Sequence, residues 1–271
     1  MRSTTRAVIL ARGLGTRMRR ADDSAMLTAG QASVADDGVK GMIPIKRPFL
    51  DYLISALADA GISDVCLVIG PEHHRVREYY SALETTRVRV HFAIQEKPLG
   101  TADAVLAAES FAAGENVLMV NSDNYYPVHT LAALREINAA GVAAFESDAL
   151  VRLGNIDADR VAKFSVVRIG AEDELVEIIE KPDAATLASF GDKVFVGMNS
   201  WSLPPEIYDA CRSITVSPRG ELELQDAVMH AVHVMGVTFR VIPFADGVLD
   251  LSSRGDIASV AERLESVEVR L

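Results

Sequence analysis

Continuous apolar runs and amphipathic segments alternate along the first half of this 271-residue sequence. Apolar runs of four to eight residues are typical of buried strands, and longer periodic segments are typical of helices. The predicted strands are 7–11, 64–70, 88–94 and 116–120. The predicted helices are 48–60, 73–83, one that begins at 101–108, and 128–140. Strands that alternate with helices indicate a parallel sheet with right-handed crossovers.

The second half of the chain is richer in strands. The hydrophobic pattern predicts a hairpin of 163–169 and 174–180, strands at 194–201 and 237–243, and helices at 221–234 and 254–264. We expect one α/β domain over 1–271, with a Rossmann-like, mostly parallel mixed sheet flanked by helices. Its first part (about 1–140) carries the main ligand loops, and a smaller strand-rich lobe lies in the second part (about 141–271).

Residues 19–39 have no hydrophobic period and are rich in small and polar side chains. This composition predicts a long loop. Long loops in compact domains are usually functional lids or disordered segments.

Composition narrows the classes of function. The formal net charge is −11, and no basic stripe is visible, which argues against a nucleic-acid surface. No apolar run has the length of a membrane span, and the start of the chain lacks a signal-peptide pattern. The two cysteines, Cys66 and Cys211, lie in apolar stretches without metal-ligand spacing, so we expect buried, reduced thiols and a cytoplasmic protein.

A glycine-containing loop follows the first predicted strand, with the sequence Gly13-Leu14-Gly15-Thr16-Arg17. Exposed backbone N–H groups together with a guanidinium are suited to hold phosphates. The loop lacks the third glycine of the dinucleotide fingerprint and the Lys-Ser/Thr of a Walker A loop. By itself the pattern fits an ordinary glycine-rich turn equally well.

Polar residues also follow the other predicted strands. Gln95 carries a donor and an acceptor on one rigid amide, which can read the edge of a base. Gly100 lets the backbone approach a ligand, and Thr101 has an alternative role as the N-cap of the helix that it opens. Because ligands of parallel sheets bind at the carboxyl ends of the strands, we expect these groups to converge.

Asp123 stands at a strand end, where a magnesium ligand is expected, since Mg²⁺ uses few carboxylates and completes its shell with phosphate and water. Asp250 is the candidate second ligand, with Asp246 and Asp256 as alternatives. Capping of a turn explains Asp123 equally well.

Further candidates are Lys40, the pair Glu180-Lys181 at a strand end, Gly197 inside a strand, and Glu221 at a helix start. Each has a plain structural alternative: a solvated lysine, an exposed ion pair, a β-bulge, or complementation of the helix dipole.

Taken in order, these motifs resemble the sugar-1-phosphate nucleotidyltransferases, over roughly residues 6–260. The resemblance implies transfer of a nucleotidyl group from a nucleoside triphosphate, UTP or dTTP favoured, to a sugar-1-phosphate, with Mg²⁺ as cofactor. It also implies that the first part (about 1–140) binds the nucleotide, that the second part (about 141–271) binds the sugar phosphate, and that the chain forms a homo-oligomer. The implied nucleotide-binding residues are Leu10, Ala11, Gly13, Leu14, Gly15, Thr16, Gln95, Gly100 and Thr101. The implied phosphate-contacting, catalytic residues are Arg17, Lys40 and Lys181. Sugar binding falls to Asp123, Glu180, Gly197 and Glu221, and metal binding to Asp123 and Asp250.

The sequence departs from the family's pattern at Arg12, where a small residue is usual, at Ser122 before the expected metal ligand, and after Asp250. Two alternative functions therefore stay open. One is a catalytically silent subunit that binds nucleotide sugar, and the other is transfer to a non-sugar phosphate such as phosphocholine.

Overall fold

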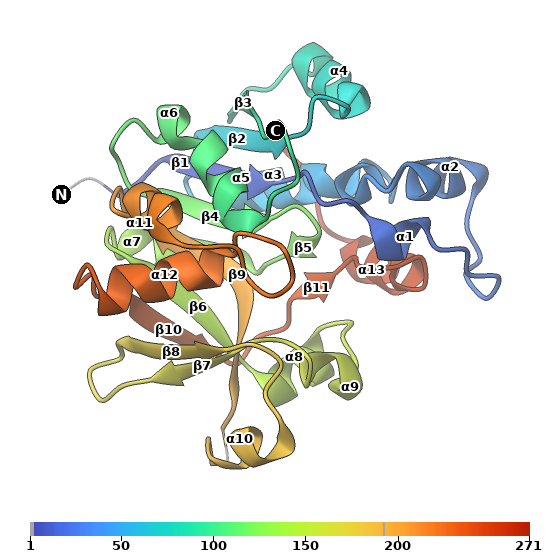
Figure 1. The fold of residues 1–271 in the computed structure, drawn as a ribbon. Coiled ribbons are helices and arrows are strands. Elements are labelled where there is room, and N and C mark those ends of the chain that lie inside the picture. Colours follow the sequence, from blue (N-terminus) through green and yellow to red (C-terminus); the bar gives the residue numbers. More distant parts are fainter. Residues whose placement is uncertain (1–2, 192) are drawn as a thin grey trace.

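In the computed structural model, which describes residues 3–191 and 193–271, the chain folds around one mixed sheet (Figure 1). Its described strands follow the order β10-β6-β9-β4-β1-β2-β3, with β7 beside β9 and β8 beside β7. The strands are β1 Arg6–Leu10, β2 Asp64–Ile69, β3 Arg89–Ile94, β4 Val117–Asn121, β6 Gly141–Glu146, β7 Val166–Ile169, β8 Leu175–Ile179, β9 Phe195–Leu203 and β10 Arg240–Phe244. A separate small pair consists of β5 Asn124–Tyr125 and β11 Leu249–Asp250.

The helices lie on both faces of the sheet (Figure 1). They are α1 Thr16–Arg19, α2 Ala29–Asp37, η1 Lys40–Met42 (a 3-10 turn), α3 Phe49–Asp59, α4 His74–Ala82, α5 Thr101–Ala107, α6 Glu109–Ala112, α7 Val128–Glu136, α8 Ser147–Leu153, α9 Ala158–Val161, α10 Ala184–Ala188, α11 Ile207–Ser213, α12 Leu224–His233 and α13 Asp256–Leu264. Strand β1 is parallel to both β2 and β4, whereas β9 runs antiparallel between β4 and β6. The predicted α/β class is confirmed.

Both faces of the sheet are buried, which explains the continuous apolar runs in the sequence. Along β1, Ile9 packs into the core beneath α3, α7 and α13, and Val8 packs into the second core beneath α5, α11 and α12. Cys66 and Cys211 belong to the second core and are free thiols, as predicted. Burial raises the pKa of both thiols to about 12, so they stay protonated near neutral pH.

The prediction of a loop over residues 19–39 is wrong, because α2 lies within it. The Thr28 hydroxyl accepts the Gln31 N–H, and the Gln31 side chain accepts the Thr28 N–H, which forms a capping box. Gly38 ends the helix with φ 75°, a conformation that glycine adopts at little cost. The capping residues were visible in the sequence, but the many small residues between them gave no helical period.

The predicted helix 128–140 is too long. The helix α7 ends at Glu136, Asn138 has φ 42°, and the chain enters β6 at Gly141. The strand β6 and the two short helices α8 and α9 were not predicted. Strand β6 is buried and lies between β9 and β10, so its Ala-rich apolar run merged with the preceding helix in the sequence pattern.

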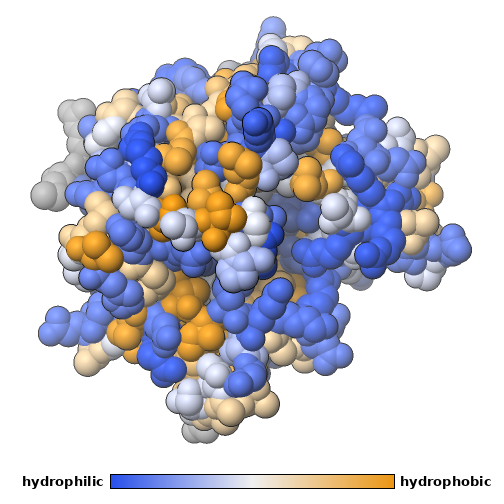
Figure 2. All heavy atoms as spheres, viewed as in Figure 1, coloured by the Kyte–Doolittle hydropathy of each residue, from blue (hydrophilic) through white to orange (hydrophobic). Residues whose placement is uncertain are grey.

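No helix in residues 3–191 and 193–271 combines the length and the apolar character that crossing a membrane requires. The face of the molecule in Figure 2 is largely hydrophilic, with hydrophobic atoms in separate groups.

Candidate active site

A cavity of about 210 Å³ lies where β1, β3 and β4 end. Several predicted site residues from separate parts of the sequence meet on its wall. They are Leu10, Ala11, Gly13, Leu14, Lys40, Gln95, Gly100, Thr101, Asp123 and Glu221. The expected convergence at the carboxyl ends of the strands is therefore observed.

The glycine loop after β1 borders this cavity, but its two glycines have different surroundings. Gly15 has φ 61°, and a Cβ built there would lie 2.0 Å from the carbonyl oxygen of Gly38. A Cβ at Gly13 would meet nothing within 4 Å. Gly15 is thus required by the close approach of two backbones, whereas Gly13 leaves open space beside the cavity. The side chains of Thr16 and Arg17 are exposed, and neither residue lines the cavity.

Gln95 is buried and its amide is fixed in one orientation. Its Nε2 donates to the Gly100 carbonyl oxygen at 3.0 Å and to Asp103 Oδ2 at 2.8 Å. Both partners are acceptors, so the nitrogen must face them. Among the described residues, none donates a hydrogen bond to Oε1. Gln95 therefore has a free acceptor for a ligand in the cavity.

The segment after Gln95 is tied to the start of α12. Gly100 has φ 124°, and a Cβ there would lie 2.3 Å from the Leu222 carbonyl oxygen. The Thr101 hydroxyl accepts the Leu224 N–H at 2.8 Å, so it caps α12 and not the helix α5 that it opens. The expectation that Thr101 caps its own helix is wrong. This contact joins the first part of the chain to the 219–223 segment.

Lys40 and Asp123 form an ion pair on the cavity wall. Lys40 Nζ lies 2.7 Å from Asp123 Oδ2, and the two side chains are 15% and 21% exposed. The turn η1 presents Lys40, and Asp123 follows β4. A mostly buried cation and a mostly buried carboxylate therefore lie next to each other where the sheet ends.

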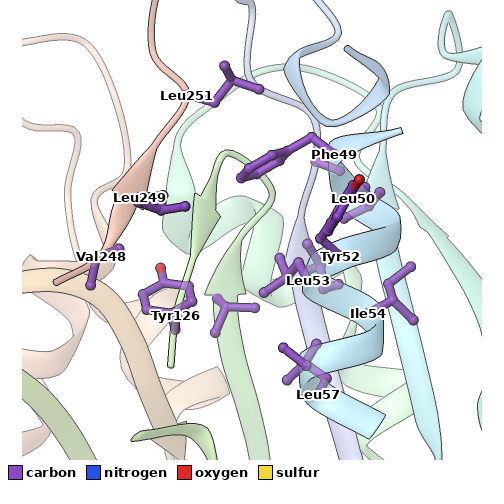
Figure 3. Close-up of a cluster of buried hydrophobic side chains, with 14 of the residues drawn as sticks. Phe49, Leu50, Tyr52, Leu53, Ile54, Leu57, Tyr126, Val248, Leu249 and Leu251 are labelled. Atoms are coloured by element: carbon purple, nitrogen blue, oxygen red, sulfur yellow. The ribbon is translucent and has the colours of Figure 1, made fainter. Parts of the chain in front are cut away.

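Asp250 is brought toward Asp123 by the small strand pair, since it lies opposite Asn124 in the register of β5 and β11. The Leu251 N–H donates to the Asp123 carbonyl oxygen at 2.8 Å. The same segments anchor the pair in the core, because Tyr126, Leu249 and Leu251 pack in one buried cluster with side chains of α3 (Figure 3). Burial and the nearby Asp123 carboxylate raise the pKa of Asp250.

Both oxygens of Asp250 are engaged. Asn124 Nδ2 donates to Oδ1 at 3.1 Å, and the Arg160 guanidinium pairs with Oδ2. Arg160 also pairs with Asp256 at 2.6 Å. The alternative ligands are less suited to face Asp123: Asp256 accepts the N–H groups of Ser252 and Ser253, and Asp246 pairs with His129.

Mg²⁺ requires oxygen ligands, which the carboxylates of this site can supply. Among the described residues, no group of three or more Asp, Glu, His or Cys side chains is arranged to hold a metal. Two carboxylates suffice when a substrate supplies phosphate oxygens, and Asp123 and Asp250 provide them. Asp123 Oδ1 has no partner in the part of the chain that the structure describes, whereas Asp250 could hold the ion only if Arg160 moved away from it. Asp123 and Asp250 are therefore suitable Mg²⁺ ligands provided that Arg160 is displaced from Asp250.

The remaining predicted residues lie outside the cavity lining. Lys181 is exposed, has φ 46° and forms no ion pair among the described residues. Partial desolvation and the Glu223 carboxylate raise the pKa of Glu180, although the residue is exposed. In the same region Arg219 pairs with Glu223 at 3.1 Å and with Glu221 at 3.8 Å.

Gly197 lies in β9, between Ala144 of β6 and the Ser165 backbone. A Cβ at Gly197 would lie 3.3 Å from Ser165 Oγ. The irregular pairing of β6 with β9 falls just beyond it, where Asn199 has φ 52°. Gly197 itself is paired, and the irregularity lies in the residues that follow it in β9.

Three residues that contact the site were not assigned from the sequence. Arg12 lines the cavity, Asp103 orients Gln95, and Arg160 pairs with Asp250. Arg12 stood out in the sequence only as a departure from a pattern. Nothing in the sequence linked Arg160 to a residue 90 positions away.

Comparison with known proteins identifies the family. The nucleotidyl transferase family model matches residues 6–242, and the chain belongs to this family. A glucose-1-phosphate thymidylyltransferase of Streptomyces griseus is 29% identical over 224 residues, which are 82% of this chain and 56% of the relative. The UTP–glucose-1-phosphate uridylyltransferase AglF of Haloferax volcanii is 26% identical over 263 residues, 96% of each chain.

The bifunctional protein GlmU of Methanococcus vannielii is 26% identical over 82% of this chain, which spans only 46% of that relative. The chain thus covers about half the length of several curated relatives, whereas it matches AglF almost end to end. A crystal structure of UDP-glucose pyrophosphorylase complexed with UDP-glucose has the same fold, with a TM-score of 0.73 over 99% of this chain and 100% of that one, at 16% identity. The predicted family and fold are confirmed.

Proposed function

We propose that this protein transfers a nucleotidyl group from a nucleoside triphosphate to a sugar-1-phosphate, which yields a nucleotide sugar and pyrophosphate. The observation that carries the proposal is the convergence of Gln95, Lys40 and Asp123 on one cavity at the end of the sheet. The cavity thereby combines a base-reading acceptor, a phosphate-binding cation and a carboxylate. The names of the thymidylyltransferase and uridylyltransferase relatives support the same reaction class.

In this reaction a phosphate oxygen of the sugar-1-phosphate attacks the α-phosphorus in line, and the bond to pyrophosphate breaks. The attacking phosphate is already ionised, so no general base is needed. The residues act by positioning the two substrates and by stabilising charge. Lys40, on the cavity wall, is the proposed contact for phosphate oxygens. We assign the pyrophosphate to Arg17 and the sugar phosphate to Lys181 on the family resemblance, since neither side chain lines the cavity.

Mg²⁺ is the proposed cofactor, held by Asp123 and Asp250, and it would supply positive charge to the triphosphate. Lys40 occupies one oxygen of Asp123 in the structure. With Asp123 committed to a metal ion, the Lys40 ammonium would be available to pair with the substrate phosphate.

The base that we favour is uracil or thymine. Gln95 offers its Oε1 as an acceptor, and the ring N3–H of either base is a matching donor. For the acceptor, we favour a sugar because Glu221 lines the cavity and pairs, like Glu223, with Arg219, so carboxylates that can accept hydrogen bonds from hydroxyl groups lie at its edge.

The proposal is tested by pyrophosphate release from the purified protein with Mg²⁺. UTP, dTTP, GTP, CTP and ATP are each paired with a set of sugar-1-phosphates and with phosphocholine. Release that needs both a triphosphate and a sugar-1-phosphate supports the proposal and identifies the base. Release with phosphocholine alone would replace the sugar with a non-sugar acceptor.

One observation favours a second candidate function, a catalytically silent subunit that binds nucleotide sugar. The Arg160 guanidinium pairs with Asp250, so that a cation of the chain itself stands beside a proposed metal ligand. Tight binding of a nucleotide sugar without pyrophosphate release, at every Mg²⁺ concentration, would support this alternative.

A further inference from the structure

Arg12 is a buried cation on the cavity wall, and its guanidinium is only partly satisfied. The side chain is 7% exposed. Its Nη2 lies 3.2 Å from Glu72 Oε1 and 3.4 Å from the Glu96 carbonyl oxygen. Its Nε and Nη1 are buried and have no hydrogen-bond partner among the described residues. Buried donors without acceptors are unfavourable, which indicates that a ligand completes the set.

The fold makes room for this side chain. A Cβ at Gly70 would lie 2.4 Å from Arg12 Nε, so the guanidinium rests against a backbone that carries no side chain there. Its one carboxylate partner, Glu72, is 51% exposed and therefore compensates the buried charge weakly. The Arg12 guanidinium thus lies at the cavity with few hydrogen-bond acceptors and only a weak compensating charge from the protein.

The position of Arg12 indicates which part of a nucleotide it meets. Its neighbours Gly70 and Glu72 follow β2, and Glu96 follows Gln95 at the end of β3. Arg12 therefore lies on the side of the cavity where Gln95 offers its free acceptor. The proposed phosphate contacts, by contrast, come from Lys40 and the loop that continues to Arg17.

A cavity wall with guanidinium donors and one amide acceptor matches a particular base edge. Uracil, thymine and guanine each have a ring N–H next to a carbonyl oxygen. Adenine and cytosine have the reverse pattern, an unprotonated ring nitrogen next to an amino group. Hydrogen-bond donors on a guanidinium pair with the carbonyl and not with the amino group.

We propose that Arg12 selects the base: its guanidinium donates to a ring carbonyl of uracil, thymine or guanine while Gln95 Oε1 accepts the neighbouring ring N–H. Because Nε and Nη1 are buried in the structure, the guanidinium must rotate about its flexible stem for its unpaired edge to meet the cavity. The inference rests on the proposed function, because it assumes that a nucleoside triphosphate binds here, and it adds the residue that discriminates between bases.

The test is the dissociation constant of the full chain for UTP, dTTP, GTP, CTP and ATP, measured by calorimetry without a sugar phosphate. The wild-type protein is expected to bind at least one of UTP, dTTP and GTP about tenfold more tightly than CTP and ATP, the discrimination expected of a good guanidinium–base contact. The variant Arg12→Ala should lose this preference, because the favoured triphosphate binds more weakly while CTP and ATP change less than about threefold.

Three outcomes would overturn the inference. If Arg12→Ala weakens all five triphosphates equally, Arg12 acts on the phosphates. If the wild-type protein binds CTP or ATP as tightly as the other three, the cavity does not read a carbonyl beside a ring N–H, and this result needs no variant. If the preference survives in Arg12→Ala, a group other than Arg12 reads the base.

Matched variants separate base reading from stability. Glu72→Gln removes the exposed partner of Arg12 and is expected to keep the base preference. Arg12→Lys keeps the positive charge but lacks the forked donors of a guanidinium, so this variant is expected to lose most of the base preference. The melting temperature of each variant shows whether it folds. Base-selective binding without turnover would contradict the proposed function and leave the role of Arg12 intact, and binding of none of the five would contradict both.

Discussion

Lys40 Nζ and Asp123 Oδ2 lie 2.7 Å apart, although 83 residues separate them in the chain. The pair stands at the end of β4 on the wall of the cavity, where a triphosphate would bring negative charge. We infer that the phosphates of the substrate pair with the Lys40 ammonium, which would leave Asp123 available to hold the proposed metal ion.

The variant Asp123→Asn is therefore expected to lower the rate of nucleotidyl transfer by at least about 100-fold, because a charged group that acts on the transferred phosphate is lost. Its melting temperature should change little, since Asp123 is partly exposed and Asn keeps its size. Pyrophosphate release measures the rate. The matched control is Asp246→Asn, which removes a carboxylate paired with exposed His129 away from the cavity. Equal rates for the two variants would remove Asp123 from the mechanism.

Arg160 competes with metal for Asp250 in this account. Replacement of Arg160 by Gln removes the cation from the carboxylate, so Mn²⁺ should bind about tenfold more tightly, as expected when one opposing charge close to the ion is removed. Electron paramagnetic resonance of free Mn²⁺ gives the affinity without any turnover. Arg152→Gln on the exposed side of α8 is the control and should leave the affinity unchanged. Unchanged Mn²⁺ binding in Arg160→Gln would show that Asp250 is not a metal ligand.

The two glycines of the loop after β1 should respond differently to alanine. In Gly15→Ala the side chain meets the Gly38 carbonyl and forces φ 61° on a residue with a Cβ, which lowers the free energy of unfolding by more than about 1 kcal/mol. In Gly13→Ala the free energy of unfolding should change by less than about 0.5 kcal/mol, because nothing lies within 4 Å.

Triphosphate affinity is nevertheless expected to fall in Gly13→Ala, since the new methyl group fills space beside the cavity. Denaturant unfolding and calorimetry measure the two quantities. Wild-type affinity in a folded Gly13→Ala protein would show that the ligand stays clear of this backbone.

Asp64, at the start of β2, makes a pH-dependent contribution to the free energy of unfolding. Arg89 donates to both its oxygens at 2.8 and 2.6 Å, and this lowers the pKa of Asp64 from 3.8 to about 2. A lowered pKa in the folded state stabilises the protein at pH values above 3.8, and this stabilisation is lost as the pH falls toward 2.

The variant Asp64→Asn should therefore lower the free energy of unfolding by about 1–2 kcal/mol at pH 7 and by much less near pH 2. Urea unfolding at both pH values measures the difference, with the exposed Asp23→Asn as control. A deficit that is the same at both pH values would show that the Arg89 pair is not its source.

The strands β1, β2 and β4 could be predicted because their central residues are buried, so their apolar runs are uninterrupted. The edge strand β3 alternates exposed and partly buried residues, and this alternation also predicts a strand. The helix α2 could not be predicted, because it rests on a capping box and a terminal glycine and buries only Val34 and Ala35. A helical period in the apolar residues arises when one face of a helix is buried, and α2 buries too few side chains to produce such a period.

The site shows a similar division. Gln95 and Asp123 could be placed together because each follows a strand of the sheet, and the ends of parallel strands meet. Lys40 lies in the turn η1 between two helices, and only its place after the glycine loop and the family resemblance suggested it. The orientation of Gln95 by Asp103 and the pairing of Asp250 with Arg160 depend on side-chain geometry across long sequence separations. Local patterns contain no record of those contacts, and these contacts decide which atoms stay free for a ligand.

The central claim is that a sugar-1-phosphate oxygen attacks the α-phosphorus of a nucleoside triphosphate in this cavity. Its most direct test uses a sugar-1-phosphate that carries ¹⁸O in its three terminal phosphate oxygens, with the base chosen by the release assay and mass spectrometry of both products. The account predicts a nucleotide sugar that keeps all three labels and pyrophosphate that carries none. Label in the pyrophosphate, or no nucleotide sugar from a folded protein that binds both substrates, would contradict it.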